Sequence, residues 1–464
     1  MSDKHEPIGQ QSESPESQKP TAQLLQEQQP QTEMQFRFEC RDIERIDQRN
    51  LEYQQAREAR ESMGLSPEPE STVLEQEYLA NAEKFIENER KKPDFPMGTS
   101  VDFTMLLADV PDREELVHRY PGREKEIDVY IQRLQNFDTK YKNGYTDILL
   151  NNFNGAVSEG TFQWMRMEHN GQVDYTEPDK VIDFLRAHPE LQNNFRGHNV
   201  FWNRTRCLPE DLRGQTKEDI RKAVIEQRLE ILKRYPGIKE WDLVNEPLSR
   251  EPRLNNNGVD QDEVVFDPEK DFDFFVELFK RAKEIAPDTK LYANEYSILS
   301  GNQCGNYVKF IQKLIEAGAP IDGIGVQGHI TEWDTASITQ MKENLDDLAK
   351  LGLPIKITEF DISDEVIRKT YFPRNKEEIS EKQMEEARAD YTKKALTIFY
   401  GNPKVNGIFQ WGFQDKSHWR SKDGEHCGLF DDNFQPNEVG KTFQNLTQNR
   451  WKLNVGNKNK LDEN

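Results

Sequence analysis

The sequence predicts an α/β protein, a (β/α)8 TIM barrel that follows a disordered and partly helical N-terminal extension. From Phe95 onward, apolar runs that favour β-strands alternate with amphipathic stretches of helical spacing, the order expected of a parallel sheet with helices outside it. Two of the apolar runs, 241–247 and 357–361, each carry a Glu near the end. Because a closed parallel barrel presents its reactive groups at the C-terminal ends of its strands, we expect both carboxyl groups at one mouth.

Eight strands are expected, separated mostly by helices. The strands are predicted at 95–101, 152–157, 195–200, 241–247, 290–293, 323–327, 355–358 and 405–411. The helices are predicted at 216–235, 272–285, 306–317, 338–351 and 383–400. Thr216 and Asp219 give the first of these helices a start that resembles a capping box. A doubly wound open sheet is the alternative, but no predicted strand is followed by a Gly-rich phosphate turn.

The chain divides into three parts by composition. Residues 1–92 form a low-complexity and partly helical extension, residues 93–453 the barrel, and residues 454–464 a polar tail. The first 55 or so residues are rich in Gln, Glu, Ser and Pro. They cannot bury enough apolar surface to offset the entropy of ordering, so we expect them to be disordered. Residues 41–90 are expected to form solvated helices around a break at 66–69, as a linker or a packing arm.

Length, net charge and the distribution of apolar residues limit the kinds of molecule that the chain is expected to bind. The 464 residues suffice for one barrel of roughly 250 to 400 residues plus an extra segment. A net charge of -22 argues against nucleic acid and against an anionic membrane surface, and it is compatible with a neutral polysaccharide. No run of about 18 apolar residues is present, so no membrane-spanning helix is expected.

The compartment is left open by the sequence. Residues 1–7 lack the apolar stretch of a signal peptide. The four cysteines, Cys40, Cys207, Cys304 and Cys427, contain no CxxC pair. We favour ordinary thiols and leave open a disulfide between Cys304 and Cys427.

Six short segments follow one another at the predicted strands. They read RGHNVFW at 196–202, WDLVNEP at 241–247, YANEY at 292–296, GIGVQGH at 323–329, TEFD at 358–361, and WGF at 411–413 with Asp415, Ser417, Trp419 and Arg420. In this order they resemble glycoside hydrolase family 10, the endo-1,4-β-xylanase family, and in several stretches its plant-type members. The resemblance covers the chain from about Phe95 to Trp451. That family is mostly secreted.

The resemblance implies a retaining endo-1,4-β-xylanase-like hydrolase that cleaves internal linkages of xylan by double displacement. Glu359 would be the nucleophile and Glu246 the acid/base, with the two carboxyl groups roughly 5 Å apart. Glu246 must be protonated to act first, so we expect nearby negative charge and partial burial to raise its pKa. No cofactor and no metal are expected, because carboxyl groups carry out both steps.

Further residues are expected to bind the sugars. His329 would donate a hydrogen bond to Glu359, Gln327 would hold the substrate beside it, and Asn245 would bind the 2-hydroxyl group. The complete set of predicted substrate contacts is Glu159, His198, Trp202, Asn245, Gln327, His329, Trp411 and Trp419. Each Trp would offer an indole face on which a sugar ring stacks.

One segment departs from the family pattern. After the second strand the family reads ENExKW, in which Asn and Lys hold sugars on the non-reducing side, whereas this chain has Gly160 and Gln163 at those positions. Two alternatives therefore stay open. One is a related β-glycan hydrolase or transglycosylase with altered sugar subsites, and the other is a barrel that binds glycan without cutting it. The exact glycan and the oligomeric state are also open.

Overall fold

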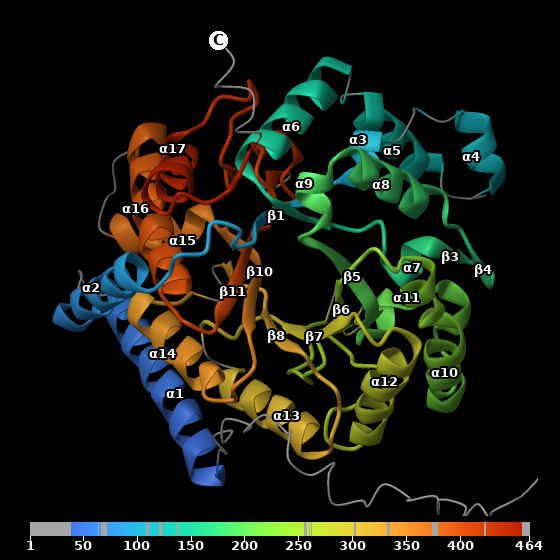
Figure 1. Ribbon diagram of the computed structural model, residues 1–464, viewed down its shortest axis with the longest axis horizontal. Helices are drawn as coiled ribbons and strands as arrows, with labels where there is room; N and C mark the ends of the chain where they lie inside the picture. The colour runs from blue at the N-terminus through green and yellow to red at the C-terminus, as the bar shows by residue number, and fades with distance from the viewer. Residues whose placement is uncertain are drawn as a thin grey trace, which may run out of the picture. The chain divides into compact units, whose positions relative to one another are not determined.

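The computed structural model describes residues 39–456, apart from 64, 66–71, 108–109, 111, 120–123, 136, 138, 255–257, 259, 261, 301–302, 332–334, 374–378 and 422–423. All eight predicted strands are present and pair in parallel, in the order β11-β1-β2-β5-β6-β7-β8-β10. They are β1 (Met97–Val101), β2 (Gly155–Ser158), β5 (Phe195–Trp202), β6 (Glu240–Asn245), β7 (Lys290–Glu295), β8 (Gly323–Val326), β10 (Ile355–Ile362) and β11 (Val405–Gln410). Pairing of β10 with β11 and of β11 with β1 closes the ring, as Figure 1 shows. The predicted TIM-barrel class is confirmed.

Three short strands and a set of helices complete the barrel. Strand β9 (His329–Ile330) pairs with the end of β10, and β3 (Glu168–His169) pairs with β4 (Gln172–Val173). The helices after β1 are α3 (Phe103–Leu107), α4 (Arg113–Arg119), α5 (Glu124–Gln135), α6 (Thr139–Asn152), α7 (Trp164–Met167), α8 (Thr176–Ala187), α9 (Pro189–Gln192), α10 (Lys217–Ala223), α11 (Glu230–Arg234), α12 (Phe272–Ile285), α13 (Cys304–Glu316), α14 (Ile338–Ala349), α15 (Asp364–Tyr371), α16 (Glu381–Tyr400) and α17 (Glu438–Gln444).

The predicted helix at 216–235 is present but contains a π-helical segment. The Thr216 side chain caps α10 by accepting a hydrogen bond from the backbone N–H of Asp219. Between α10 and α11, residues Val224–Arg228 form a π-helical turn. Arg228 in this turn is buried and donates hydrogen bonds to the backbone carbonyls of Asn199 and Val200 on β5. The irregular turn therefore anchors the helix to the strand that carries His198.

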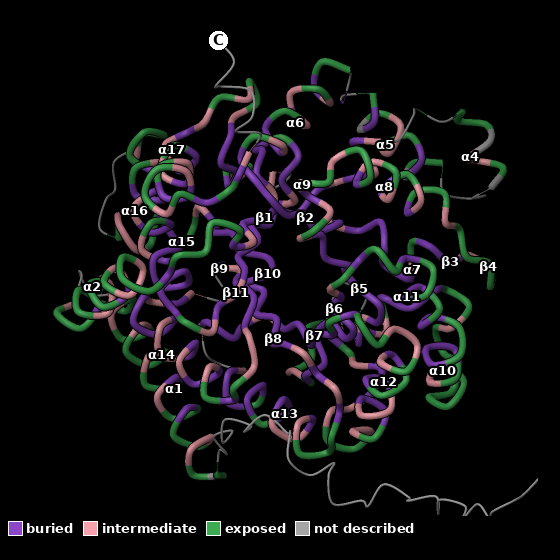
Figure 2. The backbone as a smooth tube through the Cα atoms, in the orientation of Figure 1, coloured by how far each residue is buried: buried purple, intermediate pink, exposed green. Residues whose placement is uncertain are grey.

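The core lies between the strands and the helices, and inside the barrel. Figure 2 shows the strands as the buried centre and the outer helix faces as the exposed rim. The barrel interior also holds charge: the Arg196 guanidinium forms an ion pair with Asp242 and lies over the rings of Tyr292 and Phe409. Asp242 accepts a second hydrogen bond from His198 Nδ1 at 2.9 Å. Loss of one partner of a buried ion pair strongly destabilises the folded protein. This pair therefore fixes β5 and β6 to each other beneath the mouth of the barrel.

Two helices precede the barrel and pack on it. Helices α1 (Cys40–Ser62) and α2 (Val73–Asn88) contact α13, α14 and α16. Asn50 is buried and bonds Asn344 of α14, and Arg49 forms an ion pair with Asp347 at 2.8 Å. The expectation of disorder to about residue 55 is wrong for residues 40–55, because their polar side chains find partners on α14. The predicted break at 66–69 lies outside the described residues.

Cys207, Cys304 and Cys427 are buried free thiols, so the disulfide left open between the last two is not formed. Within the described ranges, no helix has the length and apolar character needed to cross a membrane. Residues 1–38 and 457–464, which include most of the predicted disordered segment and of the polar tail, lie outside the described residues.

Candidate active site

A cleft of about 790 Å³ opens at the C-terminal ends of the barrel strands. All ten residues singled out from the sequence line it: Glu159, His198, Trp202, Asn245, Glu246, Gln327, His329, Glu359, Trp411 and Trp419. They come from six of the eight strands or from the loops that follow them. Because successive strands bring their C-terminal ends to one mouth, segments nearly 260 residues apart in sequence meet here.

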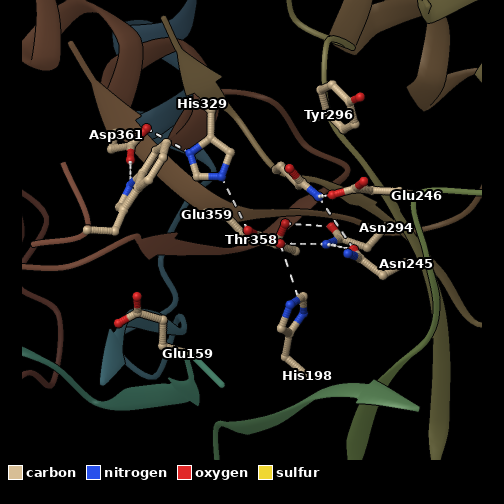
Figure 3. A network of polar contacts seen from close by, with 12 residues as sticks. Glu159, His198, Asn245, Glu246, Asn294, Tyr296, His329, Thr358, Glu359 and Asp361 are labelled. Carbon is tan, nitrogen blue, oxygen red and sulfur yellow. Dashed lines mark hydrogen bonds and ion pairs between the residues drawn. The ribbon is translucent and has the colours of Figure 1, made fainter. Parts of the chain in front are cut away.

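Glu359 on β10 is buried and surrounded by hydrogen-bond donors (Figure 3). Asn294 Nδ2 donates to Glu359 Oε1 at 2.7 Å, and His329 Nε2 lies 3.3 Å from Oε2. The Thr358 hydroxyl donates to Asn294 Oδ1 at 2.7 Å, which fixes the direction of the Asn294 amide. His198 Nδ1 lies 4.0 Å from Glu359 Oε1. These contacts fix the orientation of the Glu359 carboxyl group in the cleft.

His329 is held as an imidazolium between two carboxylates. Its Nδ1 lies 2.7 Å from Asp361 Oδ1, and Trp419 Nε1 donates to Asp361 Oδ2 at 2.7 Å. Burial opposes the charge on the ring, but Asp361 and Glu359 outweigh it and raise the pKa of His329 to about 10. Both ring nitrogens therefore donate at neutral pH, and the predicted hydrogen bond from His329 to Glu359 has its donor.

Glu246 follows β6 directly and has a backbone φ of 52°. Left-handed backbone at a residue other than Gly is uncommon, and such residues cluster at functional sites. The side chain is buried, with Gln327 Nε2 at 3.4 Å from Oε1 and Arg204 Nε at 3.4 Å from Oε2. Arg204 Nη1 also donates to the Glu246 carbonyl oxygen at 2.6 Å. Arg204 thus holds both the backbone and the carboxylate of Glu246.

The pKa of Glu246 is lower than the sequence led us to expect. Burial raises it, but the charge of Arg204, followed by the Trp202 indole and then by the charges of Arg206 and Arg250, brings the pKa below its ordinary value of 4.5. The predicted rise is therefore wrong. The reason is that β5 ends in a turn that returns Arg204, itself fully buried, to the end of β6.

A line of amide groups joins the two glutamates. Asn294 Nδ2 bonds Asn245 Oδ1 at 2.8 Å as well as Glu359, and Gln327 Nε2 lies 3.4 Å from both Asn245 Oδ1 and Glu246 Oε1. The Nδ2 group of Asn245 makes no hydrogen bond within the described residues and remains available to a ligand hydroxyl. The arrangement fixes the positions of the two carboxyl groups relative to each other.

Three tryptophans line the cleft: Trp202, Trp411 and Trp419. Trp411 packs on Val157 and Phe409 with Trp419 against this cluster, so most of its surface belongs to the core. The His329 ring lies 5.7 Å from Trp419. On the other side, the Arg206 guanidinium lies 5.4 Å from the Trp202 ring centroid. These indole rings give the cleft the flat apolar surfaces that a sugar face requires.

Three residues of the site were missed in the sequence. Asn294 and Asp361 stand inside the quoted segments YANEY and TEFD, so their position at strand ends could have identified them. Nothing in the spacing distinguishes Arg204. In the part of the chain that the structure describes, no group of three or more His, Cys, Asp or Glu side chains is placed to hold a metal ion.

His418 is buried, and we expect its imidazole to make the free energy of unfolding depend on pH in the acid range. Burial lowers its pKa from 6.5 to about 4. The unfolded chain therefore binds a proton at His418 before the folded chain does, and the free energy of unfolding falls as the pH drops from 6.5 toward 4, by about 3 kcal/mol. His418→Gln should remove this contribution to the acid-induced fall in the free energy of unfolding. Urea unfolding of both proteins at neutral and acid pH measures it, and equal acid sensitivity would contradict the prediction.

One family profile and several known proteins are similar to this chain. The profile described as glycosyl hydrolase family 10 matches residues 123–445. A protein of Acetivibrio thermocellus named anti-sigma-I factor RsgI6 is 28% identical over 67% of this chain and 36% of its own length. Endo-1,4-beta-xylanase 1 of Arabidopsis thaliana is 30% identical over 64% of this chain and 28% of its own. The beta-1,4-xylanase of Dictyoglomus thermophilum is 29% identical over 64% of this chain and 82% of its own.

Solved structures share the fold of this chain. Xylanase 10B from Thermotoga petrophila RKU-1, in complex with xylobiose, superposes with a TM-score of 0.58 at 22% identity, covering 80% of this chain and 97% of that one. The first two relatives above are much longer proteins, and the chain spans only 36% and 28% of their lengths.

Proposed function

The chain belongs to glycosyl hydrolase family 10, and from this premise we propose that it is a retaining endo-1,4-β-xylanase-like enzyme that acts on xylan. One observation carries the proposal. Two buried glutamates, Glu246 and Glu359, stand at the ends of β6 and β10 in one cleft and are linked by the amides of Asn245, Asn294 and Gln327. Paired carboxyl groups are the catalytic groups of most glycosidases.

In the first step, Glu359 attacks the anomeric carbon of the sugar that lies over it. The new C–O bond forms as the glycosidic bond breaks, and the departing oxygen takes the proton of Glu246. Asn294 and the His329 imidazolium hold the Glu359 carboxyl group in position through hydrogen bonds. The free Nδ2 group of Asn245 supplies a hydrogen bond to the 2-hydroxyl group as positive charge develops on the ring.

In the second step, water replaces the departed chain. Glu246, now a carboxylate, takes a proton from this water, whose oxygen attacks the anomeric carbon and releases Glu359. Two inversions leave the product with the configuration of the substrate. Glu246 thus acts as acid and then as base, and Arg204 favours the form needed in the second step.

Arg204 should therefore set the pH dependence of the first step. Above the pKa of Glu246 the protonated fraction falls about tenfold per pH unit, so kcat/KM on xylan should decline as the pH rises from the acid range to neutrality. Arg204→Gln removes the charge that lowers this pKa and should move the decline to higher pH. Arg204→Lys keeps a charge and serves as the control. Three superimposable pH profiles would refute this role for Arg204.

Hydrolysis itself is tested with defined polysaccharides. Reducing-sugar release should be greater on soluble xylan than on mixed-linkage glucan or mannan, and proton NMR of the first products should show the β-anomer. Greater release from glucan or mannan would favour a related β-glycan hydrolase, as Gly160 and Gln163 allow. The α-anomer as first product would exclude double displacement.

A second candidate is a barrel that binds glycan without turnover. The observation that favours it is the ion pair between Arg204 and Glu246, which opposes protonation of the acid. One relative also carries the name of an anti-sigma-I factor. Tight binding of xylo-oligosaccharides by calorimetry, with no cleavage at any pH, would establish this role and exclude the first.

A further inference from the structure

An arginine occupies the part of the cleft where the chain departs from the family pattern. Arg166, on α7, lines the cleft together with Glu159 and Gln163. Its guanidinium lies directly on Gly160: a Cβ atom at position 160 would stand 2.7 Å from Arg166 Nη1 and 2.8 Å from Cζ. Any side chain at position 160 would displace the guanidinium. Gly160 therefore provides the space in which Arg166 lies.

Among the residues that the structure describes, Arg166 has no side-chain partner, whereas two other arginines of the cleft do. Arg253 forms an ion pair with Asp262 at 3.2 Å, and Arg420 with Glu425. Arg166 is exposed, and its guanidinium makes no hydrogen bond or ion pair with any residue that the structure describes. Burial raises the pKa of Glu177, and the charge of Arg166 opposes this rise, as does the hydrogen bond that Glu177 accepts from Thr104.

The polar groups beside Arg166 are already engaged. Gln163 Nε2 donates to the carbonyl oxygen of Glu159 at 3.1 Å, and Trp164 Nε1 donates to Glu168. The side-chain amide of Gln163 is thus turned toward its own loop. Arg166 has no such partner among the described residues, and it offers a ligand a full positive charge on a chain whose net charge is -22.

We propose that Arg166 recognises a carboxylate on the polysaccharide, so that the preferred substrate is a β-1,4-linked glycan bearing uronic acid residues; this rests on the proposed glycan-degrading function. A guanidinium fork matches a carboxylate in two parallel hydrogen bonds, a fit that neutral sugar hydroxyls lack. Gly160 and Gln163 stand where the family has Asn and Lys. The contacts that those residues make with sugar hydroxyl groups are thereby replaced by one charged contact from Arg166. Arg166 is a specificity residue and takes no part in bond cleavage.

Binding tests the inference separately from catalysis. In a Glu359→Gln background, calorimetry compares a xylo-oligosaccharide carrying glucuronic acid with the same oligosaccharide after reduction of its carboxyl group. The parent should bind the acidic form about tenfold more tightly, as expected for one charge-assisted contact. Adding Arg166→Gln should abolish the difference, whereas Arg166→Lys should keep part of it. Arg186→Gln, an exposed arginine on α8 outside the cleft, is the matched control.

The outcomes separate the two proposals. Equal affinity of the parent for the acidic and reduced forms overturns the inference, as does a preference that survives Arg166→Gln. If the chain with Glu359 intact cleaves none of the polysaccharides, the hydrolase proposal fails, while the preference for acidic oligosaccharide still decides the role of Arg166. If it cleaves xylan, the ratio of kcat/KM on acidic and carboxyl-reduced xylan should follow the binding ratio.

Discussion

Glu359→Gln should lower kcat on xylan by about 10⁴-fold or more, the scale seen when a catalytic nucleophile is removed. The amide keeps the size of the side chain and can still accept from Asn294, but its oxygen cannot form the ester intermediate. Because the loss affects the first bond-forming step, KM should change little in comparison. Steady-state kinetics on soluble xylan measure both constants.

The control for Glu359 is Glu365→Gln on α15, an exposed carboxyl group paired with Lys369 outside the cleft. It should keep the parent activity, and circular dichroism should show both variants folded. Glu359→Ala with added azide gives a second readout. Azide fits the vacated space and attacks the anomeric carbon once, so the product should be the α-glycosyl azide. Full activity of Glu359→Gln would refute its assignment as nucleophile.

Glu246→Ala should lower kcat/KM on xylan by about 10²- to 10⁴-fold, the range expected when a general acid is lost. The size of the loss should depend on the leaving group. A sugar alkoxide needs a proton as it departs, whereas an acidic nitrophenolate does not, so an aryl xylobioside should form the intermediate at nearly the parent rate. Its hydrolysis then stalls because no base activates water.

Rapid-mixing kinetics with the aryl xylobioside distinguish these steps. A burst of nitrophenol followed by slow turnover is expected, and azide should speed the turnover and yield the β-glycosyl azide. Equal losses on xylan and on the aryl substrate would show that Glu246 does not protonate the leaving group. Glu251→Ala, a carboxyl group that does not line the cleft, is the control.

The fold and most of the site follow from local patterns. The alternation of buried strands and amphipathic helices repeats along the chain, and each Glu, His and Trp of the quoted segments stands where a strand ends. Since strand ends converge in a barrel, knowing the strands is enough to know that these side chains meet. This is why all ten predicted residues line the same cleft.

The remaining features depend on contacts that no local pattern records. Arg204 follows Trp202 in an irregular turn, and only the path of that turn brings its guanidinium to Glu246 and reverses the expected direction of the pKa shift. Residues 40–55 of helix α1 read as part of a disordered segment because Asn344 and Asp347, which stabilise them, are about 300 residues away. Gly160 reads as a lost contact until Arg166 is seen beside it.

The position of α1 and α2 also has a consequence for how the chain folds. Their partners are α13, α14 and α16, and Arg90, just after α2, donates to the backbone carbonyls of Tyr400 and Val405. During synthesis the contacts of Arg49, Asn50 and Arg90 must wait for partners that lie 294 to 315 residues further along the chain. Such high contact order slows folding and leaves amphipathic surfaces exposed meanwhile. Helices α1 and α2 therefore dock late, together with the helices α14 and α16 that complete the barrel.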